Sequence, residues 1–447
     1  MADLLSVGLD VGTTTTQMIL SRLTVENKAS SFTVPEMEIT DRQILYKGKV
    51  HFTPLQDKDR VDGQALRQLV EADYKAAGVA PEQVDTGAII ITGETSRKEN
   101  AKAVLEGLAA FAGEFVVTTA GPHLESVLAA KGAGATDYSE KTGKRVLHMD
   151  IGGGTANLAW IESGRITKTG CLNVGGRLLK VDDHGVLTYV SPVLQGLTDL
   201  SLGDKPSVSQ LEQVAKLLTR ALEMAAALRE KGPLLESLWT KEAGSCQIDE
   251  LPPEVISFSG GVADCIHQDR PPLAFGDLGP VLGKTIGESL LCKGEYRLGR
   301  ETIRATVIGA GCHSAQLSGS TVYYQNVTFP MKNLPVIQSP EQRHQQDGEL
   351  AVWAMQGLAA PSYEQVRALA QNIADKATGS VLIALEQDMA KALGHMLCLL
   401  LPKDTPILCI DRVKLAEGSY LDIGAPVDYC LPVVVKTLVL AKNQTGR

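Results

Sequence analysis

Two short segments with the same pattern constrain what this chain can fold into more than any other feature. Leu9–Thr16 reads LDVGTTTT, and Asp150–Asn157 reads DIGGGTAN. Each pattern begins at the end of an apolar, β-forming run, Leu5–Val11 in one case and Val146–Asp150 in the other, and each leads into a second strand-like run. The chain therefore predicts two hairpins with glycine- and threonine-rich turns, which is a coarse internal duplication.

The composition of these two turns suits phosphate binding. Glycine lets the backbone approach phosphate oxygens without a Cβ in the way, and turn N–H groups and threonine hydroxyls can donate to those oxygens. A carboxylate ahead of the turn repels phosphate, so Asp10 and Asp150 are best explained as holders of a Mg²⁺ ion, through water. The residues that we expect to bind phosphates are Gly12, Thr13, Thr14, Gly152, Gly153, Gly154 and Thr155.

Two other segments share only the D-x-G core of these motifs. Asp277–Pro280 reads DLGP and Asp422–Pro426 reads DIGAP. Neither has a threonine after the glycine, and each contains a proline, which removes an N–H that phosphate would need. We interpret both as ordinary turns.

A third element is the segment ISFSGGV at 256–262, a predicted strand that ends in two glycines. Bare backbone at Gly260 and Gly261 allows a flat ring to lie against it. An isolated S-G-G is at least as typical of a structural turn. As the third element after two phosphate turns, it predicts the adenosine site of a bound ATP.

The composition favours a packed α/β protein. The chain has 447 residues, 44% of them hydrophobic and 21% charged, and its length allows roughly three folding units. Aromatic residues make up 4% and glycines number 43, which suits glycine-rich turns better than a stacking platform for nucleic acid. The net charge of −9 argues against a general polyanion binder, and we interpret the short basic cluster Lys141–Arg145 as solvated loop charge.

The sequence carries no membrane or secretory signal that we recognise. No apolar run approaches the ~18 residues of a membrane span, and the first residues include Asp3 and no basic run. The eight cysteines are scattered, so we expect reduced thiols in a cytoplasmic protein. We interpret the neighbouring pairs Cys265/His267 and Cys312/His313 as coincidences rather than metal ligands.

Other patterns predict the elements around the motifs. The segment 207–231 reads as an amphipathic helix whose start is capped by Ser207 and Gln210. A polar stretch at 338–348 reads as a linker. Beyond it, 380–385, 386–400 and 406–411 read as strand, helix and strand, which predicts a separate α/β module.

The order of phosphate turn, helix, phosphate turn, adenosine glycines and second helix resembles actin, the heat-shock chaperone ATPases and hexokinase. The connecting helices would be Gly121–Ala135 and Arg304–Leu317, whose small residues would let them cross closely at a hinge. Within this superfamily the chain resembles, over nearly its whole length, the family of ethanolamine ammonia-lyase reactivating factors, EutA. The segments that carry this resemblance are SVGLDVGTTTTQ (6–17), GAIIITGE (87–94), AGPHLESVLAAKGAGA (120–135), DIGGGTANLA (150–159), CLNVGGRLL (171–179), SGGV (259–262), RATVIGAG (304–311) and CIDRVKLAEGSYLDIGAPV (409–427).

The resemblance implies a two-lobed, actin-like α/β ATPase fold made of duplicated ribonuclease-H-like lobes, with an additional C-terminal α/β module. The expected domain ranges are 1–140 for the first lobe, 141–303 for the second, 304–330 for the second connecting helix and return strand, and 331–447 for the C-terminal module.

The resemblance also implies a chaperone-like ATP hydrolase that acts on ethanolamine ammonia-lyase. It would use ATP and Mg²⁺ to open the lyase, release damaged cobalamin and admit intact adenosylcobalamin. The chain lacks the D-x-H-x-x-G pattern that ligates cobalt through histidine, so it should act on the lyase holoenzyme rather than hold cobalamin itself. The resemblance leaves open a homodimer and an association with an ethanolamine-utilising bacterial microcompartment.

Three residues would be catalytic on this interpretation. Asp10 and Asp150 would organise Mg²⁺ and the attacking water, and Glu125 stands where related ATPases keep a water-positioning carboxylate or amide; the alternative for Glu125 is a surface glutamate. Asn157 is a departure, because heat-shock chaperones often have aspartate there, and it predicts slow hydrolysis. We expect His123 and His148 to be packed or partly exposed histidines rather than catalytic ones.

Two other functions fit the same motifs. A small-molecule kinase of the same superfamily would need a base beside an acceptor hydroxyl, and 60–120 offers little besides Glu94 for that role. An actin-type filament is the third interpretation. ADP production without an added acceptor distinguishes an ATPase from the kinase. ATP-dependent sedimentation tests the filament interpretation.

Overall fold

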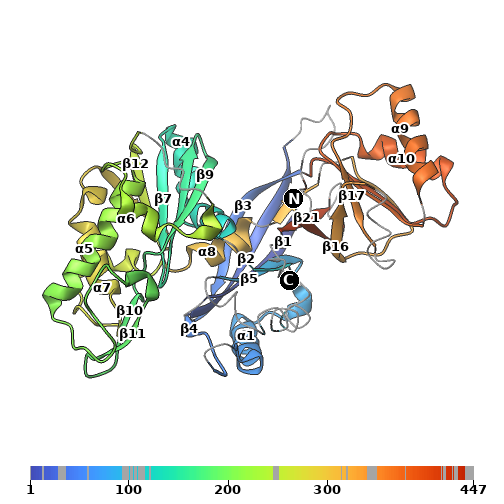
Figure 1. Ribbon diagram of the computed structural model, residues 1–447. Helices are drawn as coiled ribbons and strands as arrows, with labels where there is room; N and C mark the ends of the chain where they lie inside the picture. Colours follow the sequence, from blue (N-terminus) through green and yellow to red (C-terminus); the bar gives the residue numbers. More distant parts are fainter. Residues whose placement is uncertain are drawn as a thin grey trace, which may run out of the picture.

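The computed structural model describes residues 2–12, 15–28, 37–57, 60–92, 100, 104, 108, 116–119, 122–244, 251–313, 315–318, 321–339, 350–377, 379–413, 415, 419–424, 426 and 431–437. Its elements group around three large sheets. In Figure 1 the first sheet, with β1, β2 and β5, lies between the second, with β7 and β12, and the third, with β16 and β17. Within the described residues, no helix combines the length and apolar character needed to cross a membrane.

The first sheet has the order β3-β2-β1-β5-β6. Strand β1 pairs with β2 antiparallel and with β5 parallel, and β5 pairs with β6 parallel. The elements of this part are β1 (Ala2–Val11), β2 (Thr15–Asn27), β3 (Met37–Lys47), β4 (His51–Phe52), α1 (Gly63–Ala77), η1 (Pro81–Gln83), β5 (Thr86–Ile91) and β6 (Val116–Thr119).

The second sheet has the order β13-β12-β7-β8-β9. Strand β7 pairs antiparallel with β8 and parallel with β12, and β12 pairs parallel with β13. The elements around it are α3 (Pro122–Gly132), α4 (Ala135–Thr142), β7 (Val146–Ile151), β8 (Ala156–Glu162), β9 (Arg165–Leu172), β10 (Leu179–Val181), β11 (Leu187–Val190), η3 (Pro192–Leu194), α5 (Val208–Ala225), α6 (Pro233–Leu238), η4 (Lys241–Ala243), β12 (Val255–Ser259), η5 (Ala263–Cys265), α7 (Gly279–Gly287), η6 (Leu290–Cys292) and β13 (Glu295–Leu298).

The two sheets have the same topology, with three antiparallel strands followed by two parallel ones in the same spatial order. The apolar pattern is also repeated. Val7, Leu9 and Val11 alternate along β1 and enter the first lobe's core, as Leu147, Met149 and Ile151 do along β7 in the second. The duplication expected from the two motifs is therefore confirmed, and the chain has the two-lobed α/β fold of ribonuclease-H-like lobes.

Helices α3 and α8 (Ala305–His313) lie between the two sheets and cross closely (Figure 1). A Cβ at Gly132 would lie 1.9 Å from the carbonyl oxygen of Ala305, and one at Gly309 would lie 2.1 Å from that of Leu128. The expectation that small residues permit this crossing is confirmed. The second helix is shorter than predicted, because Ala315–Leu317 forms β14 and pairs with β21 of the third sheet, a tertiary contact that local sequence cannot show.

The third sheet is mixed, with the order β14-β21-β20-β16-β17-β18-β19-β15. Its four central strands, β16 to β19, are parallel, and the predicted strand, helix and strand are β18, α10 and β19. Most of the predicted linker at 338–348 lies outside the described residues, and the domain ranges stay predictions. The elements are β14, β15 (Tyr323–Gln325), β16 (Met331–Ile337), β17 (Val352–Met355), α9 (Tyr363–Lys376), β18 (Val381–Leu385), α10 (Ala390–Leu400), β19 (Ile407–Ile410), β20 (Ser419–Ile423) and β21 (Pro432–Thr437).

The long amphipathic helix of the second lobe is α5. Its predicted capping box is confirmed, because the Ser207 hydroxyl accepts from the Gln210 N–H and the Gln210 side chain accepts from the Ser207 N–H. The helix ends at Ala225 rather than at 231. Ala227, just beyond this end, adopts φ +55°, a left-handed conformation with which a helix cannot continue.

Candidate functional site

The first phosphate-type turn connects β1 to β2. The Gly12 N–H donates to the Thr15 carbonyl at 2.9 Å, which closes the turn. The Thr53 hydroxyl, just after β4, donates to the Gly12 carbonyl at 2.7 Å and so braces the turn from outside. Thr13 and Thr14, both expected to bind phosphate, lie outside the described residues.

The second turn, between β7 and β8, is closed by the same bond, from the Gly152 N–H to the Thr155 carbonyl at 2.9 Å. It is braced by the segment after β9, since the Gly176 N–H donates to the Gly152 carbonyl at 3.0 Å and the Arg177 N–H to that of Gly153 at 2.6 Å. Among the described residues, leaving out its chain neighbours, none comes within 4 Å of where a Cβ on Gly154 would stand. The same hydrogen bond thus closes both turns, and their contact with phosphate stays a prediction.

The predicted adenosine glycines lie beside the start of the second turn. Gly260 has φ +85°, and a Cβ there would lie 2.3 Å from the Ile151 carbonyl oxygen, so only glycine fits. The Val262 N–H donates to the same carbonyl at 3.1 Å. Among the described residues, a Cβ at Gly261 would meet only Ile303 Cδ1, at 4.0 Å. The segment with the two glycines therefore packs against the end of β7 through Gly260 and Val262, and Gly261 is the less constrained glycine.

Three carboxyl groups, those of Asp10, Asp150 and Glu125, lie close enough for the other two to act electrostatically on Asp10. The pKa of Asp10 is raised to about 7, chiefly by burial; a hydrogen bond from Thr92 lowers it, and the neighbouring charges of Glu125 and Asp150 raise it. That bond, from Thr92 Oγ1 to Asp10 Oδ1, is 2.9 Å. Asp10 and Asp150 come from different lobes and Glu125 from α3, so the fold brings together the three residues expected to be catalytic.

Asp150 is buried at the end of β7. Burial raises its pKa to about 6, while hydrogen bonds from the hydroxyls of Ser259 and Thr306 act in the opposite direction. Thr306 lies in α8, at 3.5 Å from Asp150 Oδ2. The carboxylate is therefore contacted both by the strand that leads to the adenosine glycines and by the second connecting helix.

Asn157 holds Glu125 in place. Its Nδ2 donates to Glu125 Oε2 at 2.8 Å, and both side chains are buried, so Glu125 is not a surface glutamate. In the first lobe Gln17 takes the corresponding position, opposite Asp10 as Asn157 is opposite Asp150, and its Nε2 donates to the Ile303 carbonyl at 3.1 Å. Asn157, which the sequence analysis interpreted as a lost carboxylate, is therefore a hydrogen-bond partner of Glu125, the proposed water-positioning residue.

The two amides also leave unused acceptors at the site. Because each amide nitrogen has an acceptor, the orientation of each group is fixed, and the buried oxygens Gln17 Oε1 and Asn157 Oδ1 have no hydrogen-bond partner among the described residues. Buried acceptors without donors favour a cation or its bound waters. No group of three or more His, Cys, Asp or Glu side chains in the described part could hold a metal directly.

We expect Asn157→Asp to destabilise the protein in a pH-dependent way. The change removes the N–H that Glu125 accepts and places two carboxylates together, which raises the pKa of the pair. A raised carboxyl pKa costs stability as the pH rises, because ionisation is then disfavoured in the folded state. Urea denaturation should show a loss of about 1–3 kcal/mol at pH 8 and a smaller loss at pH 5. Equal losses at both pH values would contradict this interpretation of the pair.

The two D-x-G segments set aside as turns differ in the structure. Asp277 accepts from the Gly279 N–H at 2.8 Å at the start of α7 and pairs with Arg177 at 3.3 Å, so it supports the segment that braces the second turn. Asp422 is not in a turn; it lies in β20, opposite Val434 of β21, because strand pairing decides its conformation.

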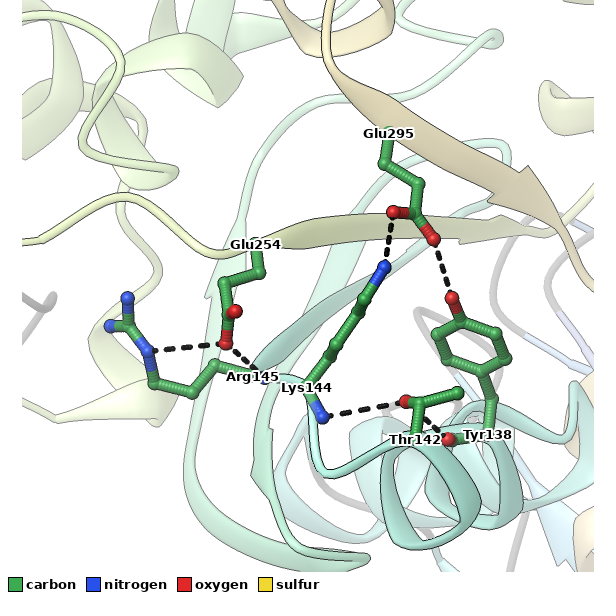
Figure 2. Close-up of polar contacts among 6 residues, drawn as sticks. All are labelled: Tyr138, Thr142, Lys144, Arg145, Glu254 and Glu295. Atoms are coloured by element: carbon green, nitrogen blue, oxygen red, sulfur yellow. Dashed lines mark hydrogen bonds and ion pairs between the residues drawn. The ribbon is translucent and has the colours of Figure 1, made fainter.

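The structure also shows where the two histidines and the basic cluster lie. His148 is fully buried, whereas His123 contacts the Thr169 hydroxyl at 2.7 Å in an exposed position. The basic cluster at Lys141–Arg145 is surface charge, and Figure 2 shows Lys144 beside Glu295 and Arg145 beside Glu254. Such exposed ion pairs contribute little to stability. The sequence reading missed Thr53, Thr92, Arg177, Ser259 and Thr306, of which Thr92 and Ser259 could have been suspected as the last residues of apolar runs.

The duplicated lobes, each with a carboxylate ahead of a glycine-rich turn, define a protein of the actin and heat-shock chaperone ATPase fold class. A family model described as ethanolamine utilisation protein EutA matches residues 2–441, and the chain belongs to this family.

Curated relatives agree with this assignment. The ethanolamine ammonia-lyase reactivase EutA of Salmonella typhimurium (strain LT2) is 40% identical, covering 97% of this chain and 98% of the relative. The protein of the same description from Escherichia coli (strain K12) is 38% identical with the same coverage. The Ppx/GppA enzyme of Aquifex aeolicus, a solved structure, is 13% identical, with 69% of this chain and 99% of that one covered and a TM-score of 0.42; this similarity adds nothing to the strand order above.

Proposed function

We propose that this protein is a Mg²⁺-dependent ATP hydrolase that reactivates ethanolamine ammonia-lyase by exchanging damaged cobalamin for intact adenosylcobalamin. The observation that carries the proposal is the convergence of Asp10, Asp150 and Glu125 between two equivalent turns. The curated relatives, which are named as reactivases of this lyase, support the choice of partner.

In this proposal the turns, the carboxylates and the two amides have separate roles. The N–H groups and hydroxyls of the two turns bind phosphate oxygens, and the glycines Gly260 and Gly261 take the adenosine. Asp10, Asp150 and the amide oxygens of Gln17 and Asn157 would hold Mg²⁺ through its waters, and the ion would supply positive charge to the phosphates. Glu125, oriented by Asn157, would position the attacking water.

The proposal extends to organisation and place. It assigns 1–140 and 141–303 to the two lobes, 304–330 to the second connecting helix and return strand, and 331–447 to the C-terminal module. It places the protein in the cytoplasm, in association with a microcompartment that uses ethanolamine.

The direct test is reactivation of a damaged lyase. Ethanolamine ammonia-lyase inactivated with hydroxocobalamin should recover activity when this protein, ATP, Mg²⁺ and free adenosylcobalamin are all present, and not when any one is left out. ATP can drive exchange only if the affinity for the lyase differs between nucleotide states, so a stable complex is expected in one state. Pull-down with ATP or ADP measures this.

Asp150→Asn should block sustained exchange while the complex still forms, and Asp422→Asn, in β20 of the third sheet, is the matched control. Rapid phosphorylation of a small alcohol or sugar by the pure protein, without any exchange of cobalamin, would favour the kinase instead.

A further inference from the structure

A chain of buried polar side chains leads away from Asp150 into the second lobe. The Ser259 hydroxyl donates to Asp150 Oδ1, and His148 Nε2 lies 2.9 Å from Ser259 Oγ. On the other side of the ring, His148 Nδ1 lies 3.1 Å from Ser257 Oγ. His148, Ser257 and Ser259 are each 0% exposed. The chain therefore runs through the lobe's interior, where unmade hydrogen bonds are costly.

The register of two parallel strands creates this chain. Strand β12 lies beside β7 so that Ser257 is opposite His148 and Ser259 is opposite Asp150. Residues two apart on a strand point to the same side of a sheet, so all four side chains share one face. One further residue along β12 brings Gly260, the first of the proposed adenosine glycines.

The charge of Asp150 fixes the direction of every hydrogen bond in the chain. An ionised carboxylate only accepts, so the single proton of the Ser259 hydroxyl points to Asp150. Ser259 Oγ must then accept from a protonated Nε2 of His148. The ring of His148 is 0% exposed, and among the described residues its nitrogens contact only the hydroxyls of Ser257 and Ser259, which favours the neutral ring, so Nδ1 accepts from Ser257.

We propose that Ser259 and His148 are positioning residues for Asp150, with His148 held as the neutral Nε2–H tautomer that directs the Ser259 hydroxyl onto Oδ1. This inference rests on the proposed function. It explains how one carboxylate oxygen is held inside the lobe while Oδ2 faces Thr306 of α8. Because Ser259 directly precedes the adenosine glycines, the same chain ties that turn to the carboxylate.

The first test reads the tautomer and needs no activity. In the full chain labelled with ¹⁵N-histidine, the signals of His148 are assigned by comparison with His148→Gln. We expect a neutral ring with a protonated Nε2. A ring protonated at Nδ1 instead would overturn the proposal, because Ser259 Oγ would then lack the donor that the chain requires.

The second test separates positioning from general stability. Ser259→Ala should lower kcat for ATP hydrolysis by about a hundredfold, with KM for ATP changed by less than about threefold, and Ser259→Thr, which keeps the hydroxyl, should recover most of the rate. Ser139→Ala is the matched control, since Ser139 is also 0% exposed and its hydroxyl donates to the Lys144 carbonyl at 2.8 Å, outside the chain.

Equal rates for Ser259→Ala and Ser139→Ala would overturn the positioning role. An absence of ATP hydrolysis in the unchanged protein would overturn the proposed function instead, and the tautomer of His148 would still decide whether the chain is ordered as inferred.

Discussion

Replacing Asp10 or Asp150 by asparagine is expected to lower ATP hydrolysis by roughly a thousandfold while making the protein more stable in Mg²⁺-free buffer at pH 8. Activity should fall because asparagine carries no charge to hold the ion that neutralises the phosphates. Stability should rise because burial opposes ionisation of both groups and neighbouring carboxylates also oppose that of Asp10; the pKa values of Asp10 and Asp150 are about 7 and 6 instead of 3.8.

The size of this gain in stability depends on pH. A carboxyl whose pKa is raised in the folded state costs no stability below pH 3.8, and its cost grows until the pH passes the folded value. The gain for Asp10→Asn should therefore be larger at pH 8 than at pH 5, and added Mg²⁺ should reduce it by stabilising only the unchanged protein. Thermal denaturation at the two pH values, with ATPase rates, measures both parts.

Asp422→Asn serves as the control for activity and should leave hydrolysis unchanged. Asp277 is unsuitable, because its contact with Arg177 links it to the second turn. Retained ATPase activity in Asp10→Asn, or lost activity in Asp422→Asn with unchanged stability, would show that the carboxylates have been assigned wrongly.

Alanine at Gly132 or Gly309 is expected to destabilise the protein by about 3 kcal/mol or more. At both positions the new Cβ would lie about 2 Å from a backbone oxygen of the opposite helix, so the helices would have to move apart. Since α3 carries Glu125 and α8 carries Thr306, ATP hydrolysis should also fall. Chemical denaturation gives the loss of stability, and initial rates give the loss of activity.

Gly294→Ala is the matched control for these two changes, because in the described part of the chain, apart from its two neighbours, nothing lies within 4 Å of the Cβ it would add. Its stability should match that of the unchanged protein within about 0.5 kcal/mol. Should Gly132→Ala and Gly309→Ala behave like Gly294→Ala, the close crossing of α3 and α8 would be refuted.

The features of the fold that the sequence predicted are those that depend on local pattern. Alternating apolar residues ahead of Asp10 and Asp150 located two equivalent hairpins, and the capping box at Ser207 located the start of α5. Glycines at 132 and 309 indicated a close helix crossing because nothing larger fits there.

The site residues that could not be predicted from the sequence depend on contacts between distant segments. Thr306 reaches Asp150 from 156 residues further along the chain, and Thr53 reaches Gly12 across 41 residues, so neither has a local pattern. The role of Asn157 could not be predicted from the sequence either. Its side chain, in strand β8, orients Glu125 in helix α3, and this contact has no local pattern. The end of α8 was set by the pairing of β14 with β21.

That last pairing joins the site mechanically to the C-terminal sheet. Helix α8 contacts Asp150 near its first turn through Thr306, and β14, which begins two residues after its last turn, is hydrogen-bonded into the eight-stranded sheet. An α-helix is stiff along its axis and transmits tilt rather than absorbing it. Helix α8 is therefore a direct connection between the carboxylate and the C-terminal sheet, so a change in its tilt at Asp150 would also shift the start of β14.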